Sequence, residues 1–265
     1  MERIGFAYNP TNDVAVELAE RLTAWCRGRG VGSFAHEAGD LDRLVGALPD
    51  ADLLVVIGGD GTFLRAAQAV ALVDVPILGL NCGKVGFLSK AEDEDAPDVL
   101  TKVLAGAFRI EERLVLEATL LPGGRERGSR RWHALNEAAV VRGAQARVVR
   151  LDVSVGATHM ATYIADGLVV SSPTGSTGYS FSAGGPILDP ASRNLVVTPV
   201  AAYLSAIRSI VVGPQQAVEV RVEEAQGCLV SIDGHIDIPL ATGDVVRVTA
   251  GDRPMRFLEI GRAHV

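Results

Sequence analysis

The sequence predicts an α/β domain followed by a second domain rich in β-strands. Through roughly the first 105 residues, short apolar runs alternate with segments in which apolar residues recur at helical spacing. Beyond about residue 109, short β-branched segments separated by Gly and Pro take over. The first pattern is typical of a parallel sheet flanked by helices, and the second of a β-sandwich. We therefore expect an α/β domain over residues 1–109 and a β-rich domain over residues 110–249.

The elements of the first domain follow from these patterns in chain order. Strands are predicted over 3–8, 53–57 and 75–80, and helices over 12–27, 63–69 and 92–105. The first helix is predicted because Val14, Leu18 and Leu22 recur at intervals of four residues. The strand at 53–57 is an unbroken apolar run without alternation, which predicts burial on both faces.

The second domain is predicted as a series of short strands. They are expected over 113–121, 131–142, 148–155, 158–164, 167–171, 208–213, 217–223, 228–233 and 244–249. No internal repeat, low-complexity tract or flexible linker interrupts the series. This regular succession favours a β-sandwich or a related β-rich fold.

Composition and charge exclude several classes of function. With 265 residues, 48% hydrophobic and 22% charged, the chain is typical of globular proteins. A net charge of −7 argues against a general nucleic-acid binder. No apolar run approaches the ~18–20 residues of a membrane span, and no signal pattern opens the chain. Cys26, Cys82 and Cys228 lie far apart without metal or disulfide spacing. We expect a cytoplasmic protein with no nucleic-acid or membrane partner.

A glycine-rich turn follows the buried strand at 53–57. It reads Gly58-Gly59-Asp60-Gly61-Thr62 and leads directly into the predicted helix. Glycines let backbone N–H groups approach a bulky anion, and a helix N-terminus favours phosphate. The turn has neither a Walker A pattern nor Gly-x-Gly-x-x-Gly spacing. A carboxylate inside a phosphate-binding turn suggests proton transfer or metal binding, and the alternative is an ordinary strand-to-helix turn.

A hydroxyl-dense stretch, residues 166–190, is the second strong signal. Its hydroxyl residues are Ser171, Ser172, Thr174, Ser176, Thr177, Tyr179, Ser180 and Ser182. Five glycines accompany them, counting Gly167. Such a stretch offers neutral donors and acceptors to a sugar or an adenine. The alternative is a Ser/Gly-rich turn region without a ligand.

Single polar residues elsewhere are weaker signals. Asn136 and Glu137 together suit recognition of a ribose or an amide, although a surface strand turn explains them as well. Arg147 suits a phosphate, but a solvated arginine is the default. His235 is more typical of a turn than of a site.

Together these segments resemble the NAD kinase family, which phosphorylates the adenosine-ribose 2′-hydroxyl of NAD to give NADP. The resemblance rests on Gly58 to Thr62, Asn81 with Gly83, Gly86, Phe87 and Leu88, Asn136-Glu137, Asp166-Gly167, Pro173 to Tyr179, Gly184 to Pro186 and Asp233-Gly234. These segments occur in the family's order and cover most of the chain. The glycine turn alone is also shared with diacylglycerol and sphingosine kinases, and similar turns occur in 6-phosphofructokinases.

The resemblance implies a Rossmann-like α/β domain, a β-sandwich domain and a tail, 250–265, that packs back on the first domain. It implies that NAD lies between the domains. It also implies a general base at Asp60, and NAD or donor contacts at Gly58, Gly59, Gly61, Thr62, Arg65, Phe87, Asn136, Glu137, Arg147, Asp166, Thr174, Thr177, Gly178, Tyr179, Ser180, Phe181, Ser182 and His235. The sequence departs from the family's pattern at Ile164, Gly178 and residues 198–212.

The same resemblance implies the partners and the reaction class. ATP, or polyphosphate, is the expected phosphoryl donor, Mg²⁺ or another divalent cation the expected cofactor, and NAD and NADP the expected small-molecule partners. No metal ligand can be named from the sequence. A homodimer or homotetramer is expected. The alternatives are a non-catalytic NAD(P)-binding sensor, which leaves Asp60 without a purpose, and a lipid kinase, which would need an apolar acyl pocket.

Overall fold

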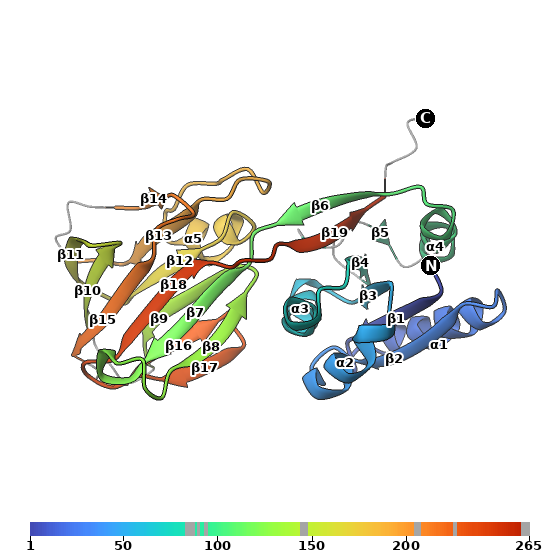
Figure 1. The fold of residues 1–265 in the computed structure, drawn as a ribbon, viewed down its shortest axis with the longest axis horizontal. Coiled ribbons are helices and arrows are strands. Elements are labelled where there is room, and N and C mark those ends of the chain that lie inside the picture. The colour runs from blue at the N-terminus through green and yellow to red at the C-terminus, as the bar shows by residue number, and fades with distance from the viewer. Residues whose placement is uncertain are drawn as a thin grey trace. The chain divides into compact units, whose positions relative to one another are not determined.

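The computed structural model describes residues 1–82, 88, 91–92, 95–143, 148–203, 208–224 and 227–260. The chain divides into two compact units (Figure 1). Unit 1 comprises Met1–Glu112 with Met255–Val265, and unit 2 comprises Arg113–Pro254. The sequence-based boundaries were placed at 109–110 and 249–250.

Unit 1 is built on a seven-stranded sheet with helices around it. Its helices are α1 (Asp13–Arg27), α2 (Leu41–Ala47), α3 (Asp60–Val73) and α4 (Ala96–Leu104). Its strands are β1 (Arg3–Tyr8), β2 (Gly32–Glu37), β3 (Leu53–Ile57), β4 (Ile77–Asn81), β5 (Ala91–Glu92), β6 (Arg109–Arg113) and β19 (Met255–Glu259). The pairs β1–β2, β1–β3, β3–β4, β4–β5 and β4–β19 are all parallel. The predicted α/β class is therefore confirmed.

The two faces of this sheet are covered by different helices. One core joins Leu18 and Leu22 of α1, Val99 of α4, and Phe6 and Val55 of the sheet. On β19, Leu258 belongs to this core, so the adjacent Phe257 points to the opposite face. There the ring of Phe257 lies 5.2 Å from that of Phe63 on α3. Because both faces are covered, β3 is buried throughout, as its unbroken apolar run predicts.

The strand order places a ligand-binding edge within unit 1. The order is β2-β1-β3-β4-β19-β6, so the direction of the connections reverses between β1 and β3. In open parallel sheets, ligands bind at the carboxyl ends of strands where this reversal occurs. The glycine turn Gly58 to Thr62 follows the carboxyl end of β3 and therefore lies at this edge.

The C-terminal strand is attached to both ends of α3. In addition to the Phe63–Phe257 contact, Arg256 donates to the Asp74 carbonyl oxygen at 2.8 Å and to its carboxylate at 3.2 Å. Asp74 ends α3 in a left-handed conformation, with φ of 61°. Residues 255–259 thus complete the sheet of unit 1 and hold the helix that begins at Asp60.

Unit 2 consists of two antiparallel six-stranded sheets. The first sheet has the order β11-β10-β15-β18-β7-β8 and the second β14-β13-β12-β9-β16-β17. The strands are β7 (Leu116–Leu121), β8 (Arg130–Ala134), β9 (Glu137–Arg142), β10 (Val149–Val155), β11 (Thr158–Ala165), β12 (Gly167–Ser171), β13 (Leu195–Val200), β14 (Ile210–Val212), β15 (Val218–Glu224), β16 (Cys228–Ile232), β17 (Ile236–Pro239) and β18 (Val245–Ala250). Inward side chains of both sheets form a single core, so the predicted β-sandwich is confirmed.

The hydroxyl-dense segment packs on part of the outer face of the second sheet. Ala138 and Val140 of β9 point into the sandwich core, so Glu137 and Ala139 point outward. The hydroxyl-dense segment packs on this outer face through α5 (Tyr179–Ser182), which contacts β12 and β13. The Ser180 and Thr198 hydroxyls are 3.0 Å apart and join α5 to β13. The segment thus lies against the strand ends that carry Asn136 and Glu137.

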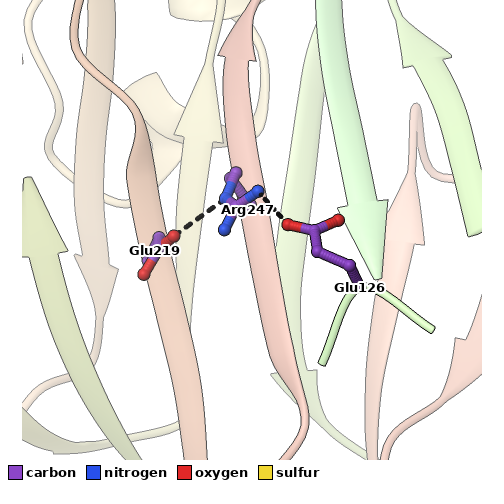
Figure 2. A network of polar contacts seen from close by, with 3 residues as sticks. All are labelled: Glu126, Glu219 and Arg247. Carbon is purple, nitrogen blue, oxygen red and sulfur yellow. Dashed lines mark hydrogen bonds and ion pairs between the residues drawn. The ribbon is translucent and has the colours of Figure 1, made fainter. Parts of the chain in front are cut away.

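The outer face of the first sheet carries a three-residue ion network. Arg247 on β18 lies between Glu219 of the neighbouring β15 and Glu126 of the β7–β8 connection (Figure 2). Both N–O distances are 2.8 Å. The network attaches the connecting loop to the sheet.

Replacing Arg247 with Met is expected to have only a small effect on stability. The Arg247 side chain is 36% exposed, and exposed ion pairs contribute ~0.2–1 kcal/mol each. We expect urea denaturation to show a loss below roughly 2 kcal/mol for the two pairs, shrinking at about 1 M salt. Arg131→Met, which removes a single pair with Glu117, is the matched control and should lose less. A salt-independent loss above roughly 3 kcal/mol would contradict this view.

Several elements were not predicted from the sequence. Strand β2 and helix α2 were missed, because β2 is an edge strand with a mixed sequence and α2 is short. Strand β13 was missed as well, and the predicted strand at 131–142 is divided into β8 and β9 at Leu135 and Asn136. Among the helices of the described residues, none has the length and apolarity needed to cross a membrane.

Candidate active site

Gly58 and Thr62 shape the turn at the end of β3. Gly58 has φ of 153°, and a β-carbon on it would lie 2.6 Å from Thr62 Oγ1. Thr62 is buried, and its N–H donates to the Gly59 carbonyl at 3.0 Å. A glycine is therefore required at 58 for the chain to turn sharply into α3. Gly59 and Gly61 remain exposed on the outside of this turn.

Asp60 is the first residue of α3 and is partly exposed. The Leu88 N–H donates to Asp60 Oδ1 at 3.1 Å, which orients the carboxylate. The first N–H groups of a helix have no partner within the helix, so this end attracts anions. A carboxylate held at such an end, at the ligand-binding edge of the sheet, is placed to accept a proton from a group bound beside an anion.

Two further site residues were predicted in the first domain, Arg65 and Phe87. Arg65, one turn further along α3, is exposed, and its Cδ would lie 3.9 Å from a β-carbon built on Gly39. It therefore lies beside the turn after β2. Phe87 lies outside the described residues, and so does Arg147 of the second domain.

Asn136 and Glu137 lie where β8 passes into β9, and a buried carboxylate holds them there. The N–H groups of Leu135, Asn136 and Glu137 all donate to the Asp233 carboxylate, at 2.9, 2.8 and 3.1 Å. The Asp233 N–H donates in return to the Glu137 carbonyl at 3.0 Å. Asp233 belongs to the Asp233-Gly234 motif of the family resemblance, which by itself implies no role for the residue.

The start of the hydroxyl-dense segment packs against the same corner of the backbone, residues 135–137, where β8 passes into β9. Ser172 donates its N–H to the Asn136 carbonyl and its hydroxyl to the Leu135 carbonyl, at 2.8 and 2.5 Å. The Gly175 N–H donates to Ser172 Oγ at 3.1 Å. A β-carbon on Gly175 would lie only 2.1 Å from the Asn136 carbonyl oxygen. Only glycine therefore allows the two backbones to approach this closely.

Glu137 is a buried carboxyl with an unsatisfied oxygen. It is 8% exposed, and its Oε2 has no hydrogen-bond partner among the described residues. Burial raises the pKa of Glu137 to about 8, and the negative charge of Asp233 adds to the rise. Asn136 Oδ1 and Thr174 Oγ1 are likewise buried, and neither atom has a hydrogen-bond partner among the described residues. Unsatisfied buried polar atoms grouped in this way are typical of a site that a polar ligand completes.

Glu137→Gln is expected to remove a pH-dependent loss of stability. Between the ordinary carboxyl pKa of 4.5 and about 8, the folded chain holds a proton at Glu137 that the unfolded chain releases. Stability through this group is therefore present at low pH and is lost as pH rises through that window. We expect equal melting temperatures for variant and wild type near about pH 4, and a higher one for the variant near about pH 8.5. Glu223 is exposed on β15, so Glu223→Gln should have the melting temperature of wild type at both pH values. The same dependence of melting temperature on pH in all three proteins would refute the assignment.

The remaining hydroxyl residues divide between buried and exposed positions. Ser180 is fully buried and is bonded to Thr198, whereas the Ser182 hydroxyl donates to the Gly178 carbonyl at 3.4 Å on the exposed side. Thr177 Oγ1 donates to the Thr174 carbonyl at 3.3 Å. Tyr179 and Phe181 are 40% and 54% exposed, so their rings are accessible to a ligand. The segment thus presents aromatic faces, while the hydroxyls of Ser176, Thr177 and Ser182 donate to backbone carbonyls of the segment itself.

Asp166 carries a partner that the sequence did not indicate. Arg142 Nε donates to Asp166 Oδ1 at 2.8 Å, and the Arg142 N–H donates to the Asp166 carbonyl at 2.9 Å. Burial raises the pKa of Tyr179, and the charges of Asp166 and Glu137 add to it while Arg142 opposes them. A β-carbon on Gly178, the residue before Tyr179, would lie 3.6 Å from Glu137 Oε2, so the start of α5 lies beside Glu137. His235 is partly exposed, with Nδ1 3.1 Å from the Asp233 carbonyl oxygen in its own turn.

Two family models match the chain. The model of the ATP-NAD kinase N-terminal domain matches residues 47–108, and that of the ATP-NAD kinase C-terminal domain matches residues 135–260. Together they cover most of unit 2 and about half of unit 1.

Curated relatives match over nearly the full length. The NAD kinase of Dehalococcoides mccartyi (strain CBDB1) is 38% identical over 259 residues, covering 98% of this chain and 91% of the relative. The NAD kinase of Symbiobacterium thermophilum is 42% identical over 269 residues, covering 98% of this chain and 94% of the relative.

Solved structures share the fold. A crystal structure of yeast NADH kinase complexed with NADH superimposes with a TM-score of 0.89, covering 99% of this chain and 84% of the other, at 20% identity. An NAD kinase from Archaeoglobus fulgidus in complex with ATP gives a TM-score of 0.78, with coverage of 97% and 94%, at 25% identity.

Proposed function

This chain belongs to the NAD kinase family, and from that premise we propose that it transfers the terminal phosphate of ATP, or of polyphosphate, to the adenosine-ribose 2′-hydroxyl of NAD, giving NADP. Relatives at 38% and 42% identity over nearly the whole chain carry the name of this enzyme. The single observation that carries the residue-level proposal is the oriented carboxylate of Asp60 at the start of α3, in an exposed glycine turn at the ligand-binding edge of a parallel sheet.

Asp60 is the proposed general base. Its carboxylate accepts the proton of the 2′-hydroxyl as the hydroxyl oxygen forms a bond to the terminal phosphorus. The bond between that phosphorus and the bridging oxygen breaks, and ADP, or a polyphosphate shortened by one phosphate, leaves with the electron pair. An alcohol is a poor nucleophile, so a positioned base contributes ~10²–10⁴-fold to the rate. The exposed Gly59 and Gly61 allow phosphate oxygens to approach the N–H groups that begin α3.

Unit 2 is proposed to hold NAD through the polar corner around Asn136 and Glu137. The unpartnered Oδ1 of Asn136 and Oε2 of Glu137 suit ribose hydroxyls, which both donate and accept. The exposed rings of Tyr179 and Phe181 suit the flat face of a base. Asp166, held by Arg142, is proposed to bind an amide or amine edge. The contacts proposed for Phe87 and Arg147 rest on the family resemblance alone.

The proposal of ATP as the donor is supported by the NAD kinase from Archaeoglobus fulgidus, which is solved in complex with ATP. A divalent cation such as Mg²⁺ is proposed to enter with the donor, because Mg²⁺ in such sites is held largely by phosphate oxygens and water. The part of the chain that the structure describes groups no three His, Cys, Asp or Glu side chains into a cation site. We therefore assign no metal ligand and no step to the ion.

A cytoplasmic homodimer or homotetramer is proposed on the family resemblance. Large apolar side chains of unit 2 are exposed, with Tyr203 at 70%, Ile187 at 59% and Val211 at 50%. Closed symmetric assemblies commonly bury such side chains. Light scattering during size-exclusion chromatography gives the mass directly.

The test of the function is an end-point assay of purified protein with NAD, Mg²⁺ and either ATP or polyphosphate. An NADP-specific dehydrogenase reads the product. NADP formed with either donor supports the proposal and identifies the donor. Tight NADP binding without NADP formation under any donor would favour a sensor, and phosphorylation of diacylglycerol or a sphingoid base would favour a lipid kinase.

A further inference from the structure

Asp233 occupies a costly position that the proposed chemistry does not use. It lies in the turn between β16 and β17, is 4% exposed, and has φ of 48°. A left-handed conformation in a residue other than glycine costs of order 1–3 kcal/mol and persists only where surrounding contacts fix it. Gly234, with φ of 68°, completes the turn.

The contacts of Asp233 explain why this cost is borne. Its Oδ1 accepts the N–H groups of Asn136 and Glu137, and its Oδ2 accepts that of Leu135. These N–H groups lie at the corner between two strands, and one buried carboxylate satisfies all three of them. The Asp233 N–H closes the arrangement on the Glu137 carbonyl. Residues 135–137 are thereby fixed to a turn almost 100 positions away in the chain.

We propose that Asp233 is a positioning residue of the dinucleotide site, fixing Asn136 and Glu137 through the backbone and setting the charge of Glu137 through its own. This inference rests on the proposed function, in which Asn136 and Glu137 bind NAD. In this role Asp233 acts through Asn136 and Glu137, because its buried carboxylate accepts from the backbone N–H groups of residues 135–137.

The two buried carboxyls of this corner, Glu137 and Asp233, differ in how their charge is stabilised. Burial raises the pKa of Asp233, but its three N–H donors and His235 oppose the rise. Glu137 has an unpartnered oxygen, and burial, followed by the negative charge of Asp233, raises its pKa to about 8, which favours the proton on Glu137. The other charged and titratable groups nearby are Tyr179 on α5 and, beyond it, the Arg142–Asp166 pair. A protonated Glu137 offers a ribose both a donor and an acceptor, whereas an ionised one only accepts.

Asp233→Asn tests the proposal in the full chain. The amide keeps one oxygen for Asn136 and Glu137, places an NH₂ group against the Leu135 N–H, and removes the charge. We expect the KM for NAD to rise roughly tenfold or more with kcat changed far less, because displaced binding groups weaken binding. We also expect the pH midpoint of NAD affinity to move to lower pH by roughly one unit or more. A purely structural role would raise KM without moving that midpoint.

The matched control is Asp237→Asn, on β17 of the same hairpin. Asp237 is exposed and accepts only from the Ser231 hydroxyl in the contacts described, at 2.6 Å, so KM and the pH midpoint should stay at wild-type values. A folded Asp233→Asn chain with wild-type KM and midpoint would overturn the proposal.

A measurement on the wild-type chain covers the case in which Asp233→Asn does not fold. Carboxyl ¹³C NMR of the ligand-free protein, with Glu137 assigned by Glu137→Gln, should show Glu137 titrating near neutral or alkaline pH while Asp233 remains ionised. Titration of Glu137 near its ordinary 4.5 would overturn the proposal. The NMR result needs no dinucleotide, so it is independent of whether wild type forms NADP.

Discussion

Asp60→Asn is expected to lower the turnover of NAD phosphorylation at least roughly a hundredfold, because a general base contributes ~10²–10⁴-fold and an amide cannot accept the proton. The substitution is isosteric, and the amide oxygen still accepts the Leu88 N–H that orients the side chain. NAD affinity should therefore stay within several-fold of wild type, since most of the proposed NAD-binding groups belong to unit 2. Loss of kcat without loss of affinity is the signature of a residue that acts mainly in the transition state.

Steady-state kinetics with ATP and calorimetry with NAD separate these two quantities. Asp98→Asn is the matched control, because Asp98 is an exposed aspartate in the first turn of another helix of unit 1, α4. Its kcat should equal that of wild type. Near-normal turnover in Asp60→Asn would remove Asp60 from the role of base, whatever the affinity.

Gly175→Ala is expected to have the largest effect on the dinucleotide site. The added β-carbon would lie 2.1 Å from the Asn136 carbonyl oxygen and 2.5 Å from its carbon, and both are backbone atoms that cannot rotate away. Either the hydroxyl-dense segment or residues 135–137 must move. Because overpacking a well-packed region costs ~1–3 kcal/mol or more, we expect a loss of stability of roughly 3 kcal/mol. We expect NAD affinity to fall at least roughly tenfold.

Chemical denaturation and NAD calorimetry measure the two effects of Gly175→Ala. Gly46→Ala is the control, since a β-carbon at Gly46, within α2, meets nothing within 4 Å. Alanine there should raise stability by roughly 0.5–1 kcal/mol through its helix propensity. Wild-type stability and affinity in Gly175→Ala would mean that the close approach of the two backbones is not required.

Much of the fold follows from local sequence patterns. The run Leu53–Ile57 predicts a strand buried on both faces, and the intervals of four from Val14 predict the helix that the structure shows as α1. The elements that were missed lack such patterns. Strand β2 pairs on one side only and reads Gly-Ser-Phe-Ala-His-Glu, and α2 has seven residues, too few for a clear helical period.

Some residues of the candidate site could likewise be predicted from local sequence, and others could not. The turn from Gly58 to Thr62 was predicted because its glycines, carboxylate and position after a strand are contiguous in the sequence. The resemblance supplied the other site residues, and their roles stay predictions. Arg142 was not singled out, because the Arg142–Asp166 pair joins residues 24 positions apart that meet only when β9 and β12 align.

Local sequence patterns are enough to give the order of the domains, the strand–turn–helix that carries Asp60, and the family to which the chain belongs. Hydrophobic period, glycine placement and contiguous motifs are properties of neighbouring residues, and they act locally. The tertiary structure decided that Asp233 holds Asn136 and Glu137, that Gly175 must be glycine, and that Glu137 is buried beside a second carboxylate. These features depend on strand register and on backbones meeting across long separations, and no local pattern encodes them.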